Sequence, residues 1–305
     1  MYGLFRPKML TLGQKVALIA PSSPPASTHL IDFAVSYIKS IGLIPVLGKN
    51  CKEQYGYLAG DDSLRAEDVN WAFSNGDIAG VFCLRGGYGT QRILDKLDFD
   101  IIRKNPKFFC GYSDITALHT AINQIAGFVT YHTPMLATHD FAKAGEYTLR
   151  SFHHQIFKAT PNVYRNPTRQ KWEFLSTGFA AGQLCGGNLS VISAGIGTEF
   201  EIQTSGKILF IEEIGEEPYK IDRMLNQLRL AGKFDELEGM IFGAFTDCEP
   251  SDKQSLTIPQ IIKNLRLDIP ILYNFACGHT YPTASLPMGA KARLDSATDL
   301  FEVLT

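Results

Sequence analysis

The stretch Phe108-Phe109-Cys110-Gly111-Tyr112-Ser113-Asp114-Ile115-Thr116 changes character halfway along, and this change indicates how the chain folds. Its first residues are apolar and typical of a buried strand, whereas a helix is expected after Ser113. A serine at a tight strand-to-helix turn is lifted out of the sheet, beside free N–H groups that can bind an oxyanion. The turn therefore resembles a nucleophile elbow, although the match to G-x-S-x-G is partial. The alternative, that Ser113 only caps the helix, stays open here.

The same alternation of strand and helix extends through the first half of the chain. Short apolar runs predict strands at 15–20, 43–47, 79–84, 108–110 and 128–131. Helical spacing of apolar residues predicts helices at 30–41, 64–73, 92–97 and 114–125. Strands that alternate with helices form right-handed crossovers, so a parallel sheet is expected.

The second half has its own strands and helices and predicts a second domain. Apolar runs at 208–214, 240–245 and 269–275 are expected to be strands, and 218–230 is expected to be a helix with proline in its first turn. The segment 141–177 carries more charge, asparagine and proline, with no clear strand from 139 to 172. We therefore predict domains at 1–140 and 178–305, joined by a helical linker. A length of 305 residues also favours two domains.

The composition is that of an ordinary globular protein. Hydrophobic residues make up 45% and charged residues 20%, and the 29 basic residues are balanced by 31 acidic ones. This balance indicates neither a nucleic-acid partner nor an anionic membrane surface. The six cysteines form no CxxC pair, which argues against a zinc ribbon and favours buried, reduced thiols in the cytoplasm. The N-terminus shows no signal peptide, and the longest uncharged stretch is too rich in glycine for a membrane span.

A second turn that could carry chemistry is Leu84-Arg85-Gly86-Gly87-Tyr88-Gly89-Thr90. It also follows a predicted strand, and its three glycines let the backbone turn sharply and approach a ligand. A carboxylate, a phosphate or an oxyanion could rest on its N–H groups. It matches neither the Walker A loop nor G-x-G-x-x-G. A plain tight turn is the alternative.

A serine nucleophile needs a base, usually a histidine oriented by a carboxylate. His279 follows an apolar strand and a glycine, which is a typical place for a catalytic group. His132 and His139 also follow a strand, whereas His119 is expected to point away from Ser113.

The carboxylate candidates are Glu212 and Glu213, adjacent at the end of the apolar run Ile208–Ile214. Strand alternation places them on opposite faces. Spacing alone selects no triad among these histidines and acids.

Taken in order, these pieces resemble the LD-carboxypeptidase family, the serine peptidases typified by muramoyltetrapeptide carboxypeptidase. The resemblance covers residues 13–294 and rests on several motifs in sequence order. They are VALIAPSSPP (16–25), YLAGDDSLRAEDV (57–69), LRGGYGTQRIL (84–94), GYSDITALH (111–119), CGGNL (185–189), ILFIEEIGEEPYKIDRML (208–225), GH (278–279) and LPMGAKARLD (286–295). Each motif alone is weak, but their order and spacing together are highly specific.

The resemblance implies a Ser–His–Glu triad made of Ser113, His279 and Glu212. It implies an α/β fold with two domains. The N-terminal one is a parallel-sheet Rossmann/flavodoxin-like domain that carries the serine. The other is a smaller mixed α/β C-terminal domain with the glutamate and histidine, and the active site lies at the interface. No cofactor and no metal are implied.

The resemblance also assigns an oxyanion hole to backbone N–H groups of Gly87, or Gly86, and Asp114. The implied substrate is a murein tetrapeptide that loses its terminal D-alanine. Arg85 is a candidate for binding the substrate carboxylate. A homodimer is carried over from related enzymes.

Two alternatives remain. Relatives with the same triad hydrolyse a peptidyl-nucleotide antibiotic or its aminoacyl-nucleotide product and so confer immunity. A protein of another class, a noncatalytic nucleotide- or flavin-binding protein, would share the doubly wound sheet. The missing G-x-G-x-x-G motif argues against the second alternative.

Overall fold

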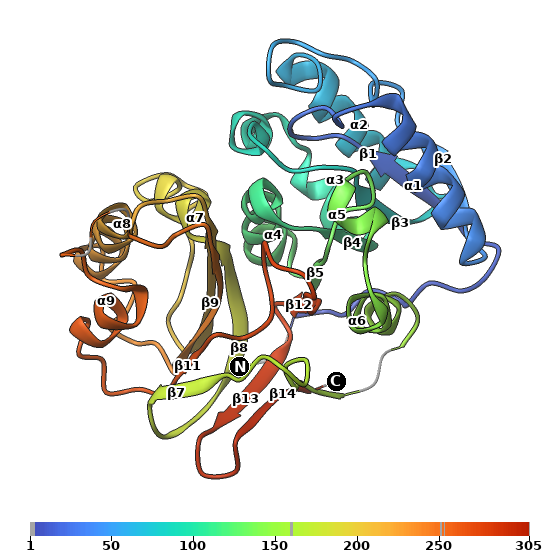
Figure 1. Cartoon of the computed structure of the whole chain (residues 1–305). Coiled ribbons are helices and arrows are strands. Elements are labelled where there is room, and N and C mark those ends of the chain that lie inside the picture. The colour runs from blue at the N-terminus through green and yellow to red at the C-terminus, as the bar shows by residue number, and fades with distance from the viewer. Residues whose placement is uncertain (1–3, 159–160, 251, 253, 305) are drawn as a thin grey trace. The chain divides into compact units, whose positions relative to one another are not determined.

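The computed structural model describes residues 4–158, 161–250, 252 and 254–304 (Figure 1). The chain divides into two compact units. Of the described residues, the N-terminal unit comprises 4–158 and 285–287, and the C-terminal unit comprises those of 161–284 and 288–304. Within the segment 141–177, which was expected to be a linker, helix α6 (Glu146–Phe157) falls in the N-terminal unit and strand β7 (Glu173–Ser176) in the C-terminal unit.

The N-terminal unit is built on a six-stranded sheet with the order β12-β5-β4-β3-β1-β2. The five strands that come first in the chain are parallel, in the flavodoxin-like order 2-1-3-4-5, which confirms the predicted fold class. The bounds are β1 Lys15–Ile19, β2 Ile44–Leu47, β3 Ile78–Cys83, β4 Phe108–Gly111, β5 Thr130–His132 and β12 Leu286–Met288.

The helices of this unit follow the strands, as the alternation predicts. Helix α1 buries Leu30, Ile31, Ala34 and Ile38, one apolar stripe at helical spacing. The helix expected at 114–125 is broken into three short pieces of 3₁₀, α and π geometry. The bounds are α1 Thr28–Ser40, α2 Asp62–Ser74, η1 Thr90–Lys96, α3 Phe99–Lys104, η2 Ser113–Ile115, α4 Thr116–Ala121, η3 Ile122–Ala126, α5 His139–Ala142 and α6 Glu146–Phe157.

The strand order of this sheet indicates where a ligand binds. In open α/β sheets, ligands bind outside the carboxyl ends of the strands, where the strand order reverses. Here the reversal lies between β1 and β3, because the chain adds β2 on one side of β1 and later strands on the other. The loops that follow β1 and β3 are Pro21–Pro25 and Leu84–Gly89, and both carry motifs singled out from the sequence.

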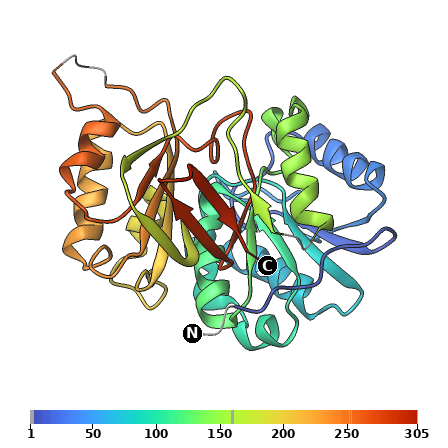
Figure 2. The same ribbon diagram turned by 90° about the horizontal axis from the view of Figure 1, so that it is seen from below.

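The C-terminal unit contains an eight-stranded mixed sheet with the order β6-β14-β13-β8-β9-β10-β11-β7. Strands β8 to β11 are parallel neighbours, and the outer strands pair antiparallel, including the hairpin of β13 and β14 (Figure 2). The bounds are β6 Asn162–Val163, β7 Glu173–Ser176, β8 Phe179–Asn188, α7 Leu189–Ala194, β9 Lys207–Ile214, α8 Pro218–Leu230, β10 Gly239–Thr246, α9 Ile258–Asn264, β11 Ile271–Tyr273, β13 Lys291–Asp295 and β14 Leu300–Val303.

Several strands of this unit are not predicted by the sequence pattern. Strand β6 lies within 139–172, where no clear strand was expected. Strand β8 is the longest of the described strands, yet its glycines obscure the apolar pattern. One of these glycines is needed because the backbones approach closely: a Cβ on Gly186 would lie 1.9 Å from the carbonyl oxygen of Phe210 in β9.

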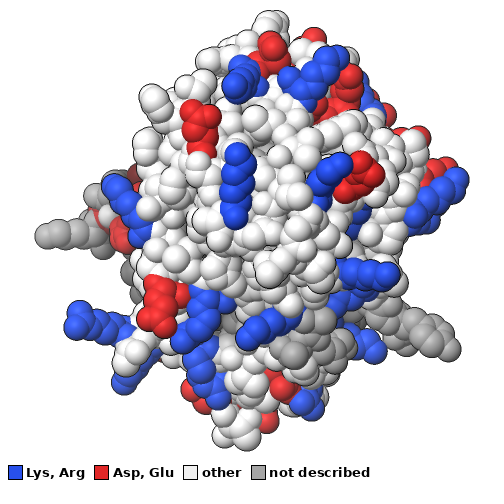
Figure 3. Space-filling view, turned by 90° about the vertical axis from the view of Figure 1, so that its right-hand side faces the viewer, with Lys and Arg blue, Asp and Glu red and all other residues white. Residues whose placement is uncertain are grey.

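The state of the cysteines and the distribution of surface charge agree with the sequence-based expectations. All six cysteines are buried and none forms a disulfide. Within the described part of the chain, no helix has the length and apolar character needed to cross a membrane. On the face shown in Figure 3, basic and acidic side chains are interspersed, as the balanced composition predicts.

Candidate active site

Ser113 lies at the turn between β4 and the short helix η2, and its backbone is strained. Its φ is 63°, in the left-handed region that residues with a Cβ rarely adopt. The N-cap position of η2 belongs to Tyr112, so Ser113 is not the capping residue that the alternative reading supposed. Strain of about 1–3 kcal/mol at one residue persists only where the surroundings impose it, and it concentrates at functional sites. A left-handed residue at a strand-to-helix turn is the backbone conformation expected of a nucleophile elbow.

The glycine-rich turn after β3 packs directly against this serine. A Cβ on Gly86 would lie 2.9 Å from the Cβ and 3.1 Å from the Oγ of Ser113, so only glycine fits there. Gly87 has a φ of 109°. Among the described residues, none accepts a hydrogen bond from the backbone N–H groups of Gly86, Gly87 or Asp114. These donors are available for a developing oxyanion beside the serine.

The carboxylate of Asp114 joins three loops at the carboxyl edge of the sheet. It accepts hydrogen bonds from Ser22 Oγ at 2.6 Å and from the Thr90 backbone N–H at 2.8 Å. The Thr90 hydroxyl donates in return to the Asp114 carbonyl. Burial raises the pKa of Asp114, and these hydrogen bonds oppose that shift. The side chain of Asp114 and its two partners were not recognised as functional from the sequence, although the Pro21-Ser22-Ser23 loop at the strand-order reversal is a signal that could have found them.

Two arginines hold the same loops. The buried Arg65 donates at 2.7 Å to the carbonyl oxygens of Pro21 and Gly89. Arg85, the candidate for carboxylate binding, donates at 2.7 Å to the carbonyl oxygen of Pro24 and is half-buried. One part of its guanidinium is thus committed to the loop after β1, and its other N–H donors remain for a ligand.

His119 supports the elbow from behind. Its Nε2 lies 2.9 Å from the carbonyl oxygen of Gly111, and its Nδ1 lies 2.9 Å from the Thr130 hydroxyl. A carbonyl only accepts, so Nε2 carries the proton and Nδ1 accepts from Thr130. Complete burial lowers the pKa of His119 to about 3, and the imidazole is neutral. His119 points away from the nucleophile, as expected, and its hydrogen bond holds the backbone of Gly111, two residues before Ser113.

In the C-terminal unit, Glu212 and His279 form a hydrogen-bonded pair. His279 Nδ1 lies 2.6 Å from Glu212 Oε2, and the His279 backbone N–H donates to the same oxygen at 3.1 Å. Glu212 is completely buried, whereas the His279 side chain is 13% exposed. The carboxylate fixes the tautomer, so Nε2 carries the lone pair that a general base needs.

An irregularity in the sheet brings these two residues together. The register of β10 against β9 shifts between Phe242 and Phe245, and the backbone N–H of Ala244 within the shift donates to the Cys277 carbonyl. The chain after Cys277 is thereby held against Glu212. Gly278 has a φ of 111°, and a Cβ there would lie 2.7 Å from the Cβ of Glu212. Only glycine permits this approach.

Glu213 is buried on the other side of the strand. Its carboxylate accepts from Asn188 Nδ2 at 2.9 Å, and from the backbone N–H and hydroxyl of Ser190 at 2.8 and 2.6 Å. Both partners lie at the start of α7, so Glu213 caps that helix. The two acids point to opposite faces, as strand alternation predicts, and Glu212 is the one that contacts His279.

The two other histidine candidates, His132 and His139, both lie in the N-terminal unit. His132 is buried in β5, where its ring contacts Tyr112, and His139 is exposed at the start of α5. No group of three His, Cys, Asp or Glu side chains suited to a metal occurs among the described residues.

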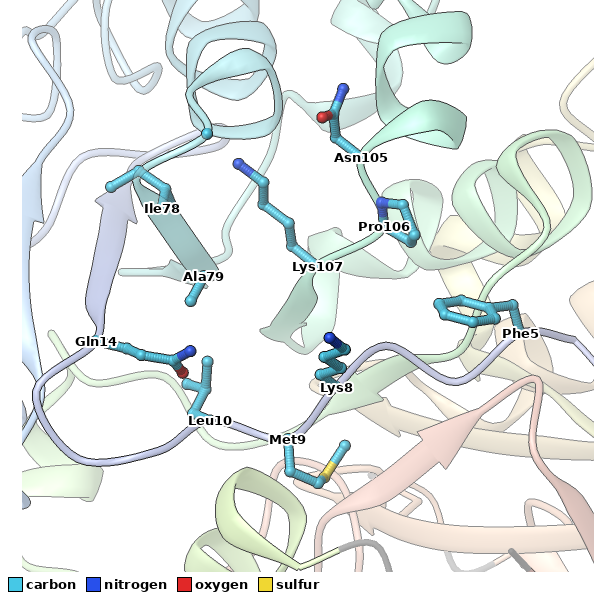
Figure 4. A pocket seen from close by; sticks show the side chains of 11 residues that line it. Phe5, Lys8, Met9, Leu10, Gln14, Ile78, Ala79, Asn105, Pro106 and Lys107 are labelled. Carbon is cyan, nitrogen blue, oxygen red and sulfur yellow. The ribbon is translucent and has the colours of Figure 1, made fainter.

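A cavity of about 350 Å³ lies at the opposite, amino-terminal edge of the N-terminal sheet (Figure 4). Its lining includes Gln14 before β1, Ile78 at the start of β3 and Lys107 before β4. Lys107 Nζ donates to the carbonyl oxygens of Ala72 and Asn75 at 2.8 and 2.6 Å, and burial lowers its pKa to about 8. This lysine caps the C-terminus of α2. The cavity is therefore a weaker candidate site than the carboxyl edge.

Comparison with known proteins gives consistent matches along the chain. Residues 16–133 match the LD-carboxypeptidase N-terminal domain and residues 181–294 match the LD-carboxypeptidase C-terminal domain. A probable murein peptide carboxypeptidase of Bacillus subtilis is 43% identical over 297 residues, which cover 96% of this chain and 92% of that protein.

Two further matches carry different names. The microcin C7 self-immunity protein of Escherichia coli is 27% identical, over 94% of this chain and 92% of its own length. The crystal structure of a muramoyltetrapeptide carboxypeptidase from Oxalobacter formigenes has a TM-score of 0.82 and 28% identity, covering 95% of this chain and 98% of that one.

Proposed function

This chain belongs to the LD-carboxypeptidase family, and we propose from that membership that it is a serine carboxypeptidase acting on murein peptides. Its substrate would be a murein tetrapeptide, cut at the L–D amide bond that precedes the terminal D-alanine. The observation that carries the proposal is the left-handed backbone of Ser113, next to the backbone N–H groups of Gly86, Gly87 and Asp114 that donate to no described residue. Such a serine is poised for nucleophilic attack.

In the proposed mechanism, His279 Nε2 takes the proton of the Ser113 hydroxyl as the oxygen attacks the amide carbonyl. Glu212 keeps the imidazole in the required tautomer through the Nδ1 contact of 2.6 Å and stabilises the imidazolium that forms. The imidazolium then gives its proton to the departing D-alanine amine. A water molecule then attacks the acyl-enzyme. His279 takes the proton of this water and gives it to the Ser113 oxygen as the acyl group leaves.

The oxyanion of the tetrahedral intermediate is assigned to the N–H groups of Asp114 and of Gly87 or Gly86. Each such donor contributes about 3–4 kcal/mol of transition-state stabilisation in comparable sites. Arg85 is assigned to the terminal carboxylate of the substrate. Its neighbour Gly86 lies against Ser113, and its guanidinium contacts the loop after β1 through the carbonyl oxygen of Pro24.

A second candidate function follows from the match to the self-immunity protein, which spans almost the whole chain. A serine peptidase with the same triad could cleave a peptidyl- or aminoacyl-nucleotide. The difference would lie in the group that the site binds beyond the scissile bond. The two candidates therefore share a mechanism and differ in substrate.

The proposal is tested by incubating the protein with murein tri-, tetra- and pentapeptides and with an aminoacyl-nucleotide, followed by mass spectrometry. The tetrapeptide should lose D-alanine, and its C-terminal amide and its L–L analogue should stay intact. Cleavage of the aminoacyl-nucleotide alone would favour the second candidate.

The nucleophile is tested with Ser113→Ala. This variant should lose several orders of magnitude in kcat while losing at most about 1 kcal/mol of stability, because the Cβ that occupies the strained position is kept. Residual turnover above a few per cent of the wild type would remove Ser113 as the nucleophile.

A further inference from the structure

Two exposed tyrosines lie beside the proposed oxyanion hole and form a pair. The rings of Tyr57 and Tyr88 are 5.6 Å apart at an interplanar angle of 66°, an edge-to-face contact. Tyr57 is 67% exposed and Tyr88 is 47% exposed. Large aromatic side chains left in water at the carboxyl edge of a parallel sheet, close to a nucleophile, are typical of a binding surface.

Tyr57 is presented by a rigid turn. Tyr55 and Leu58 exchange two backbone hydrogen bonds of 2.8 and 3.0 Å, with Gly56 between them at a φ of 59°. Leu58 is buried, and the following residue, Ala59, donates its N–H to the carbonyl oxygen of Ser22 at 2.9 Å. The turn is therefore anchored to the loop after β1, and Tyr57 projects from it.

Tyr88 is held as firmly, from the glycine-rich turn itself. Its backbone N–H donates to Ser23 Oγ at 3.2 Å. Arg92 lies close to its phenol, and two hydrogen bonds of 2.9 Å fix the Arg92 guanidinium to the carboxylate of Asp62. The turn that carries Tyr88 is thus anchored, and charged and hydroxyl groups that can hydrogen-bond a polar ligand lie beside the ring.

The position of the pair matches one part of the proposed substrate. Gly86 touches Ser113, and Tyr88 is only two residues further on, so its Cα lies within about 7 Å of that of Gly86. In a murein tetrapeptide, three residues separate the scissile bond from the sugar that carries the stem, or about 10 Å when extended. An extended stem that starts at Ser113 can therefore place its sugar over the tyrosines.

From this arrangement, and resting on the proposed function, we propose that Tyr57 and Tyr88 form a platform that binds the pyranose ring of a muramoyl sugar. The face of an aromatic ring is electron-rich, and the C–H groups on one side of a pyranose are electron-poor, so the two surfaces stack. The nearby Arg92 and Asp62 supply hydrogen bonds for ring hydroxyl groups. The platform makes the enzyme prefer sugar-linked stems to free peptides.

The experiment measures kcat/KM for D-alanine release from a muramoyl tetrapeptide and from the free tetrapeptide. The wild type should favour the muramoyl substrate by about five- to tenfold, the size of one aromatic contact. Tyr57→Ala and Tyr88→Ala should bring this ratio close to one, whereas Tyr57→Phe and Tyr88→Phe should keep it.

Tyr55 provides a matched control. It lies in the same turn, is 68% exposed, and makes no ring contact with a described residue, so Tyr55→Ala should leave the ratio at its wild-type value. Alanine variants that slow both substrates equally, or a wild type without preference, would overturn the platform while leaving the proposed function standing. If the alanine variants lost activity only toward an aminoacyl-nucleotide, the platform would bind a nucleobase instead of a sugar.

If the wild type released no D-alanine from either peptide, the proposed function would fail on its own. The platform would then be judged by binding of the muramoyl peptide to Ser113→Ala and to the double variant with Tyr88→Ala, measured by calorimetry. Equal affinity of the two proteins for that peptide would overturn it, and a five- to tenfold loss in the double variant would support it.

Discussion

Glu212 and Glu213 are adjacent and chemically identical, yet they contact different partners. Glu212 contacts His279, and Glu213 caps α7 through Asn188 and Ser190. A single-residue step along a strand separates a carboxylate that can orient a base from one that stabilises a helix. Activity and stability measurements should therefore separate the two residues.

We expect Glu212→Gln to reduce kcat by about 10⁴-fold, because the amide keeps the shape but loses the charge that stabilises the imidazolium. Glu213→Gln should stay within about tenfold of wild-type activity. It should lower the free energy of unfolding by about 1–3 kcal/mol, since an amide cannot accept all of the hydrogen bonds that the buried carboxylate accepts. Steady-state kinetics and urea unfolding of both variants make the test, and exchanged phenotypes would show that the proposed triad is wrong.

At the scale of elements, two local irregularities shape the candidate site. One is the strained turn between β4 and η2, and the other is the register shift between β9 and β10. Each places a side chain where regular geometry would not. Substitutions that act on these irregularities, without touching a proposed catalytic side chain, should therefore affect activity.

Gly278→Ala should reduce kcat by 100-fold or more, on the order expected for a displacement of about 1 Å at a catalytic pair. The added methyl would lie 2.6 Å from Glu212 Oε2 and so push the carboxylate away from His279. The matched control is Gly215→Ala, at a φ of 73° with no atom within 4 Å of the added Cβ. Both variants carry the backbone strain of a positive φ, but only the first should lose activity. Equal kcat values would contradict the proposed role of the close approach.

His119 gives the elbow a pH dependence that can be measured as stability. Its pKa is about 3 in the folded protein and 6.5 in an unperturbed histidine, so between these values the unfolded chain binds more protons. The free energy of unfolding should therefore fall as the pH is lowered from 6.5 toward 3, by up to about 1.4 kcal/mol per pH unit from this residue.

The measurement is urea unfolding at pH 7 and at pH 4.5 for the wild type and for His119→Gln. The variant should lose much less stability than the wild type between the two pH values, because glutamine does not titrate. His29→Gln, at an exposed position in α1, is the control and should follow the wild type. If His119→Gln had the same pH dependence as the wild type, His119 would not be a buried neutral base.

For the whole molecule, the proposed mechanism draws every catalytic group from the protein itself. Dialysis against EDTA should therefore leave kcat/KM for the tetrapeptide unchanged to within about twofold, because no step in the proposed mechanism uses a metal. The assay compares untreated, dialysed and zinc-supplemented enzyme. Activity that disappears on chelation and returns with zinc would overturn the serine mechanism.

The sequence by itself determined the local features of this protein. The positions of the parallel strands β1 to β5 follow from apolar runs, and those of helices α1 and α8 follow from apolar periodicity. Both signals depend only on residues close together in the chain. The glycine–serine turn at Gly111–Ser113 and the opposed faces of Glu212 and Glu213 are local in the same sense. The glycine-rich strand β8 was missed because its residues serve close packing against β9, which no local pattern reveals.

Only the tertiary structure decided the contacts between distant residues. His279 meets Glu212 across 67 positions of sequence, and Ser22 meets Asp114 across 92. The pairing of Tyr57 with Tyr88 likewise depends on loops that follow different strands. Such contacts are set by strand order and register, because these determine which loops share an edge of a sheet. Residue spacing can nominate the partners, and the packing of the sheets selects among them.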